Sequence, residues 1–234
     1  MIEEAPEEQL LLAHVGILEE LPQSELEYLA KRSPIVHLAK KESLTLDEYR
    51  RGVLFLLSGR VRVHEPTFGI QDLTFPVLEG GTVVGQPASK FRPSRASRVE
   101  ALEASVLRVV GWDDFEDLVL RNPEVGLKTI RLFGERLDEY ERRFSELIRK
   151  EVPARLAGLL LRLSERERAE PGVERSRTPV RYTHRLLASM VGSNREAVTR
   201  ALGVLKNAGA VEIRDRQIYV IDAAALEYFA EVAR

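Results

Sequence analysis

Apolar residues near the C-terminus recur at three- and four-residue steps, which predicts two short amphipathic helices separated by a turn. The two apolar faces consist of Leu187, Ala188, Val191, Val198, Ala201, Leu202 and Leu205. A helix-turn-helix needs a small residue where its helices cross, a residue free to take positive φ in the turn, and an apolar anchor on the second helix. Ala188, Gly192 and Val198 supply these at a fitting spacing, so residues 183–207 are predicted to form this motif.

The outward face of the second predicted helix carries side chains that can read or hold DNA. They are Asn194, Arg195, Glu196, Thr199, Arg200 and Lys206. Arginine commonly donates to guanine O6 and N7, and a carboxylate accepts from the cytosine amino group. An ordinary surface helix pair with solvated charges is the alternative, but the joint fit of core, turn and outward residues favours DNA recognition.

A different pattern fills residues 35–110, where short apolar runs alternate with turn residues. The runs are 35–38, 53–57, 59–64, 72–78, 83–84 and 106–110. Ser58-Gly59 and Glu79-Gly80-Gly81 are typical of hairpin turns. Many short strands at this spacing predict an antiparallel β-barrel or jelly roll. A helix at residues 23–32 precedes them, with Ser24 as its expected cap.

The pattern from residue 123 to about 150 predicts one long helix with a narrow apolar seam. The seam residues fall in two heptad columns, Ile130, Leu137 and Phe144 in one, and Phe133, Tyr140 and Leu147 in the other. Because such a helix cannot bury its seam alone, we expect it to pair with its twin in a homodimer. Packing along its own β-domain is the alternative.

Pro153 cannot continue a helix without the loss of a hydrogen bond, but it suits a first helical position. The long helix is therefore predicted to break here, with Val152 and Pro153 as a hinge. A new helix at 153–167, strands at 180–182, 211–214 and 217–221, and a terminal helix from 223 complete a winged helix-turn-helix. The predicted fold is α+β, with a β-barrel or jelly-roll domain at 1–121, a dimerisation helix at 122–151 and a DNA-binding domain at 152–234.

The overall charge is small, but its distribution is uneven. The chain is 44% hydrophobic and 31% charged with a net charge of −2, as in a folded globular protein. Residues 1–27 hold eight glutamates and no Lys or Arg, whereas residues 178–221 hold seven Lys and Arg against three acids. The basic charge therefore coincides with the predicted helix-turn-helix, as a DNA-binding domain requires.

Other features of the composition exclude several classes of protein. The absence of cysteine excludes disulfides, thiolate-bound zinc and cysteine nucleophiles. No apolar run reaches the roughly 18–20 residues of a membrane span, and we expect a cytoplasmic location. No nucleophile–base pair, phosphate-cradling glycine loop or metal-ligand histidine spacing is present, so neither an enzyme nor a metal site is predicted.

The order β-domain, seam helix, hinge and winged helix-turn-helix resembles the cyclic-AMP receptor protein/FNR (CRP/FNR) family of bacterial transcription regulators. The most specific stretch is Val191-Gly-Ser-Asn-Arg-Glu-Ala-Val-Thr-Arg-Ala-Leu, which is similar to the family's recognition segment. Asn122-Pro-Glu, Arg155-x3-Leu-Leu and Gly81-x3-Gly85 are further matches. The resemblance implies a regulator that binds double-stranded DNA, activates transcription and contacts RNA polymerase, partly through residues 166–177.

The resemblance also implies roles for individual residues. Arg195, Glu196 and Arg200 occupy the base-reading positions, whose usual target is an inverted repeat of a TGTGA-like half-site. Contacts to the DNA backbone are expected from Thr183, His184, Arg185, Asn194, Thr199, Arg214 and Arg216, which position the protein without specifying sequence.

The ligand pocket departs from the family pattern. Gly85 is followed by Gln86 where the family has a ribose-binding glutamate, and Arg95 is followed by Ala96 where it has a phosphate-binding serine. Tyr140 and Glu141 stand where cyclic-AMP responders have Thr-Ser. We therefore expect no cyclic AMP and no cofactor. Haem is a weaker alternative: His14, His37 and His64 are the histidines of the β-domain, and each is better explained as a surface or core residue.

Three readings of the signal stay open. In the first, the β-domain binds an unidentified small molecule. In the second, the dimer binds DNA constitutively and is controlled by its abundance. In the third, the chain is a cytoplasmic adaptor whose β-domain and seam bind a protein.

Overall fold

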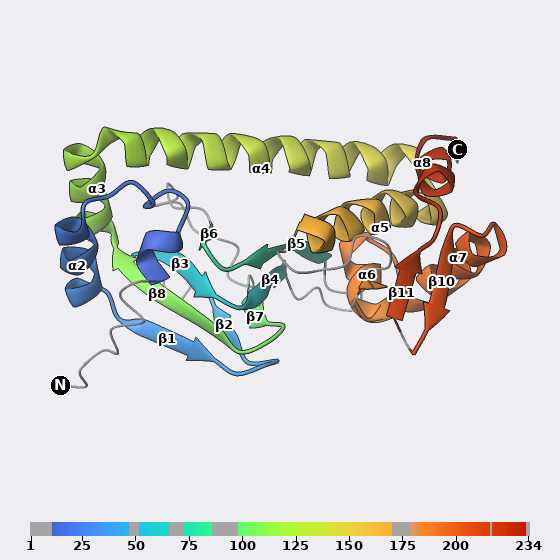
Figure 1. The fold of residues 1–234 in the computed structure, drawn as a ribbon, viewed down its shortest axis with the longest axis horizontal. Helices are drawn as coiled ribbons and strands as arrows, with labels where there is room; N and C mark the ends of the chain where they lie inside the picture. Colours follow the sequence, from blue (N-terminus) through green and yellow to red (C-terminus); the bar gives the residue numbers. More distant parts are fainter. Residues whose placement is uncertain are drawn as a thin grey trace. The chain divides into compact units, whose positions relative to one another are not determined.

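The computed structural model describes residues 11–46, 52–65, 73–85, 98–169, 179–180, 182–215 and 217–232. The chain divides into two compact units, residues 1–68 with 74–138, and residues 69–73 with 139–234. The boundary falls within the long helix α4 (Pro123–Arg149), so one continuous helix contributes to both units (Figure 1). The three-segment division at 121/122 and 151/152 stays a prediction.

The first unit contains two four-stranded sheets whose paired strands are antiparallel. One sheet has the order β1 (Ile35–Leu38), β8 (Ser105–Gly111), β3 (Gly52–Ser58), β6 (Thr82–Val84). The other has the order β2 (Ser43–Thr45), β7 (Arg98–Ala101), β4 (Arg60–Glu65), β5 (Leu73–Glu79). Among the described strands the sheets stay separate, which fits the jelly-roll form of the prediction rather than a closed barrel.

Strand β3 lies at the centre of the first unit because both of its faces are buried. Leu54 and Leu56 join the cluster between the two sheets, where Val61 and Val99 come from the second sheet. On the other face, β3 packs against the 3-10 helix η1 (Leu11–His14) and the helices α2 (Gln23–Arg32) and α3 (Trp112–Arg121). Burial on both faces explains why β3 is an unbroken apolar run.

Two strands and one helix cap differ from the sequence prediction. Strands β2 and β7 were not predicted, because β2 has only three residues and β7 is short and begins with a charged residue. Ser24 does not cap α2, as the capping position is Pro22 and no side chain bonds there. Proline suits this place because the first helical N–H groups lack intrahelical partners in any case.

The second unit is a winged helix-turn-helix built around α5 (Val152–Ala169), as predicted. Its buried residues include Leu156, Leu160 and Leu163, and it packs against α7 (Arg195–Asn207) and α8 (Ala223–Val232). The remaining elements are α6 (His184–Met190), β9 (Pro179–Val180), β10 (Val211–Arg214) and β11 (Gln217–Val220), with the three strands in the order β10-β11-β9. No helix in the described ranges is long and apolar enough to cross a membrane.

Arg108 joins α2 to the first sheet from a fully buried position on β8. Its side chain is 0% exposed, and its Nη1 donates to the carbonyl oxygens of Ala30 at 2.6 Å and Ser33 at 2.8 Å. These carbonyls lie at the C-terminal end of α2, where backbone acceptors lack helical donors and the helix dipole is negative. One guanidinium therefore satisfies the helix end and fixes it against the sheet.

We predict that Arg108→Met lowers the free energy of unfolding by about 2 kcal/mol or more, because buried carbonyl oxygens lose their donor. Urea unfolding followed by the fluorescence of Trp112, the one tryptophan in the chain, measures this unit directly. Arg98→Met, at an exposed position on β7, is the control and should leave the midpoint nearly unchanged. Equal midpoints for the two variants would contradict the role given to Arg108.

Candidate DNA-binding interface

The turn between α6 and α7 is fixed by backbone geometry and two side-chain caps. Gly192 takes a φ of 62°, the left-handed conformation that the motif requires. Thr183 Oγ1 accepts a hydrogen bond from the Leu186 N–H at 3.2 Å, and Asn194 Oδ1 accepts one from the Ala197 N–H at 2.7 Å. Each helix therefore begins at a polar cap.

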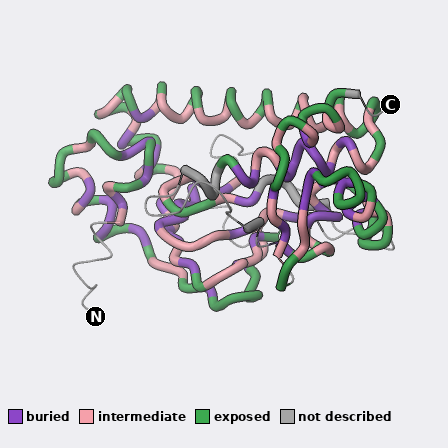
Figure 2. The backbone as a smooth tube through the Cα atoms, turned by 45° about the vertical axis from the view of Figure 1, so that its right-hand side comes forward, coloured by how far each residue is buried: buried purple, intermediate pink, exposed green. Residues whose placement is uncertain are grey.

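The buried face of the motif leaves the predicted base-reading residues in solvent. Ala188 and Val198 are fully buried where the helices meet, as the sequence indicated. Arg195, Glu196 and Arg200 are all exposed on the opposite side of α7. Figure 2 shows buried and exposed segments side by side in this unit. The helix is held from behind while its outer face can meet a ligand.

A hydrogen-bonded chain not foreseen from the sequence connects the starts of α6 and α7. Thr199 Oγ1 donates to the Arg195 carbonyl oxygen at 2.9 Å and lies 3.1 Å from His184 Nδ1. Since the hydroxyl has only one proton, Nδ1 must be the donor in the second bond. His184 and Thr199, both predicted to contact the DNA backbone, thus also position the first turn of α7.

In the wing, formed by β10 and β11, a carboxylate competes with DNA phosphate for Arg214, an expected backbone contact. Arg214 Nε and Nη2 both donate to the carboxylate of Glu212 on the same strand, β10. These hydrogen bonds raise the pKa of Arg214. The side chain of Arg214 is 53% exposed and that of Glu212 is 37% exposed, so a phosphate can reach Arg214. Arg185 is also exposed, whereas Arg216 lies outside the described residues.

Arg155 connects three parts of the second unit. Its Nε donates to the Val191 carbonyl oxygen at 2.9 Å, at the end of α6, and its Nη1 donates to the Lys150 carbonyl oxygen at 2.6 Å. Burial lowers the pKa of Arg155. The link spans the predicted hinge at Val152 and Pro153, where α5 begins.

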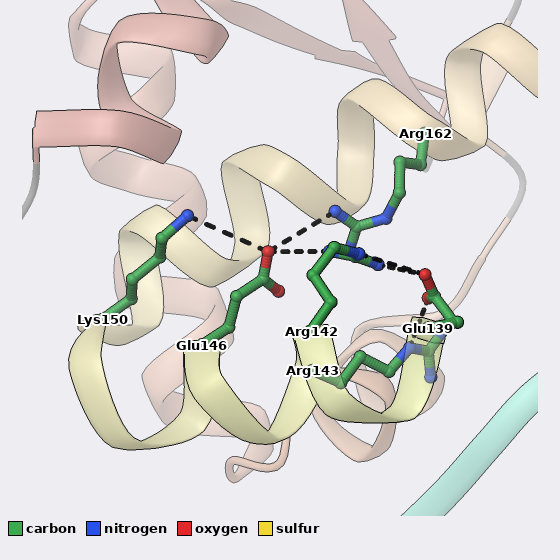
Figure 3. Close-up of polar contacts among 6 residues, drawn as sticks. All are labelled: Glu139, Arg142, Arg143, Glu146, Lys150 and Arg162. Atoms are coloured by element: carbon green, nitrogen blue, oxygen red, sulfur yellow. Dashed lines mark hydrogen bonds and ion pairs between the residues drawn. The ribbon is translucent and has the colours of Figure 1, made fainter. Parts of the chain in front are cut away.

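An ion-pair network also joins α4 to α5 (Figure 3). Glu146 Oε1 lies 2.7 Å from Arg142 Nη1 and 3.8 Å from both Lys150 Nζ and Arg162 Nη1. Glu139 accepts from Arg142 and Arg143. Burial opposes ionisation of Glu139, but the two arginine hydrogen bonds outweigh it and lower its pKa. The network therefore anchors the last turns of α4 to α5.

Comparison with known proteins supports the winged helix-turn-helix assignment. Residues 154–229 match the Crp-like helix-turn-helix domain. Transcriptional regulator SdrP of Thermus thermophilus is 32% identical over 176 residues, which cover 75% of this chain and 82% of that protein. The chain belongs to the CRP/FNR family.

Two further relatives agree with this membership. The cyclic AMP receptor protein of Thermus thermophilus is 28% identical over 180 residues, covering 77% of this chain and 80% of the relative. The crystal structure of a CRP/FNR-family regulator from the same organism aligns with a TM-score of 0.69 at 25% identity, covering 86% of this chain and 100% of that one. This CRP/FNR protein is a DNA-binding transcription regulator, and its relatives are regulators rather than enzymes.

The seam predicted for CRP/FNR dimerisation is only partly exposed in the structure. Ile130, Leu137 and Phe144 are 70%, 56% and 66% exposed, and Leu147 is 40% exposed. Phe133 and Tyr140 are half-buried, and Phe133 packs against the core of the first unit with Arg136 over its ring. At Phe133, the helix therefore faces the first unit.

The structure describes half of the predicted ligand-pocket residues. Gln86, Arg95 and Ala96 lie outside the described residues. Gly85 has a φ of 81° at the end of β6, and Glu141 is exposed on α4. The departure from the cyclic-AMP-binding pattern stays a prediction based on the sequence.

We predict that Glu212→Gln strengthens DNA binding and steepens its salt dependence, because Arg214 is released to a phosphate. Each added phosphate contact raises the slope of log K against log salt by about 0.9. Titration of a labelled duplex at several salt concentrations measures both quantities. In an Arg214→Ala background the same change should have much less effect, and an equal gain there would show that Glu212 acts on DNA directly.

Proposed function

We propose that the protein is a homodimeric transcription activator that reads a TGTGA-like inverted repeat and needs no cyclic AMP. The observation that carries this proposal is the exposed face of α7, where Arg195, Glu196 and Arg200 project from a helix that is capped and buried behind. Contacts with RNA polymerase belong to the proposal through family membership.

The chemistry of the three side chains fits the half-site. Arg195 can donate two hydrogen bonds to guanine O6 and N7, Glu196 can accept from a cytosine amino group, and Arg200 can donate to a guanine on the opposite strand. The cap at Asn194 and the bond from Thr199 to the Arg195 carbonyl oxygen hold the first turn of α7 in place. A backbone fixed in this way presents the three side chains in a constant direction, which supports sequence-specific binding.

A homodimer provides a second recognition helix for the second half of the DNA repeat. Apolar side chains line one side of α4 in solvent, and a second copy would bury them. Two recognition helices related by a twofold axis read half-sites about 34 Å apart, one turn of B-DNA. An inverted repeat is therefore the expected target.

Independence from cyclic AMP rests on the residues at the pocket positions. Gln86 lacks the negative charge that would accept the ribose hydroxyl, and Ala96 lacks the hydroxyl for the phosphate. Glu141 adds a negative charge where an anion would have to be accommodated.

We predict that Arg195→Ala costs about 1–3 kcal/mol on the cognate site and removes the preference for guanine at one position of each half-site. In vitro selection from a random duplex library, followed by affinity measurements, tests both. Lys206→Ala removes a positive charge from the same helix and should keep the selected motif. If Arg195→Ala bound cognate and scrambled DNA as the wild type does, the base-reading role would be wrong.

The purified protein without additions should bind its selected site with full affinity, and cyclic AMP should leave the affinity unchanged. Fluorescence anisotropy with and without the nucleotide makes the comparison. Binding that appears only with cyclic AMP would overturn this part of the proposal. Weak binding in both conditions would point to a different small-molecule effector.

A further inference from the structure

The exposed apolar side chains of α4 follow a register different from that read in the sequence. We call the exposed set the α4 stripe. It consists of Leu127, Ile130, Leu137, Phe144 and Ile148 with Gly134 and Glu141 between them, and Leu147, 40% exposed, lies outside it. The spacings alternate between three and four residues, which is the a/d pattern of a coiled coil. Leu127, Gly134, Glu141 and Ile148 form one column, and Ile130, Leu137 and Phe144 form the other.

The exposure of individual residues decides this register. Leu127 and Ile148, outside the predicted seam, are 47% and 69% exposed. Phe133 and Tyr140, inside the predicted seam, are half-buried. Figure 2 shows α4 beyond its first turn as alternating intermediate and exposed segments. The α4 stripe is therefore the continuous face that a second copy can cover.

Glu141 interrupts the α4 stripe with a charge that no residue in the described ranges neutralises. Its neighbours on α4, Glu139 and Glu146, are both paired with arginines. No hydrogen bond or ion pair connects Glu141 to any other residue that the structure describes. It lies between Leu137 and Phe144 on the stripe, so an interface there would surround its carboxylate with apolar groups.

Steric crowding by the described residues does not explain the glycine at position 134. A Cβ atom built at this position meets nothing within 4 Å, so packing in the described structure does not require glycine. Glycine in the middle of a helix costs about 0.5–1 kcal/mol relative to alanine. A small residue on a helix face lets the backbone of another helix approach closely. Gly134 on the α4 stripe therefore agrees with a second copy of the chain packing there.

We propose that Glu141 limits the stability of the homodimer formed through the α4 stripe. This inference rests on the proposed homodimer. In a parallel pair related by a twofold axis, equivalent residues of one column face each other, so two Glu141 carboxylates meet in the interface. They repel each other and lose hydration without gaining a partner.

A weakened dimer makes DNA binding depend steeply on protein concentration, since two copies are needed for one inverted repeat. Glu141 thereby converts the abundance of the protein into occupancy of its sites. No effector is needed for this form of control.

The test compares dimer dissociation constants of the full chain by sedimentation or by dilution of a fluorescently labelled protein. Glu141→Leu should tighten the dimer at least about tenfold, because the interface gains an apolar pair in place of two facing charges. Glu141→Gln, which removes only the charge, should tighten it by a smaller factor. Glu135→Leu, at an exposed position off the stripe, should leave the constant unchanged.

Leu137→Glu separates this inference from the proposed homodimer. If Leu137→Glu dissociates the dimer while Glu141→Leu and Glu141→Gln leave it unchanged, the role of Glu141 is wrong and the homodimer stands. If Leu137→Glu has no effect, the α4 stripe is not the interface and both fail. A wild-type dimer that stays intact at nanomolar concentration would also overturn the inference, as would equal tightening by Glu135→Leu.

Discussion

DNA recognition by this protein depends on α7 being held from one side only. Val198, Ala201 and Leu202 are buried against the rest of the second unit, while the charged residues of the opposite face stay in water. The capping bond at Asn194 and the bond from Thr199 fix the first turn, where two of the three predicted base-reading side chains lie. Apolar burial supplies the stability, and the polar bonds set the orientation.

The same division between buried and exposed faces governs the rest of the chain. β3 is apolar throughout because sheet and helices cover it from both sides. α4 has little buried surface because much of its apolar side is left in solvent. Arg108, Arg155 and Glu146 add polar contacts between elements: Arg108 joins α2 to the first sheet, Arg155 joins α5 to the ends of α4 and α6, and Glu146 joins α4 to α5.

The sequence predicted the helix-turn-helix well because every requirement of that motif is local. Gly192, Ala188 and Val198 lie within eleven residues of one another, and their spacing alone identifies the turn and the crossing. Most strands of the β-domain were also recognised, since apolar runs and glycine turns separate them. The bond between His184 and Thr199 and the pairing of Arg214 with Glu212 were not predicted, because they depend on side-chain directions.

The exposed face of α4 was likewise difficult to predict from the sequence. Two apolar columns were visible in the sequence, but a choice between residues 127, 134, 141 and 148 and residues 133, 140 and 147 requires knowledge of which side the chain itself covers. Gly134 and Glu141 made the exposed column hard to see in the sequence, because neither is apolar. The packing of Phe133 against the first unit shows which side of α4 its own chain covers at that residue.

The contacts of Arg155 make the last turn of α4 and the end of α6 a single mechanical part. Both carbonyl groups are bound by one planar guanidinium, so a displacement of the end of α4 relative to α6 would break one of these hydrogen bonds. In a dimer, the angle at which the two α4 helices cross would then set the distance between the two recognition helices. Half-site spacing would thus be determined by side chains that never approach DNA.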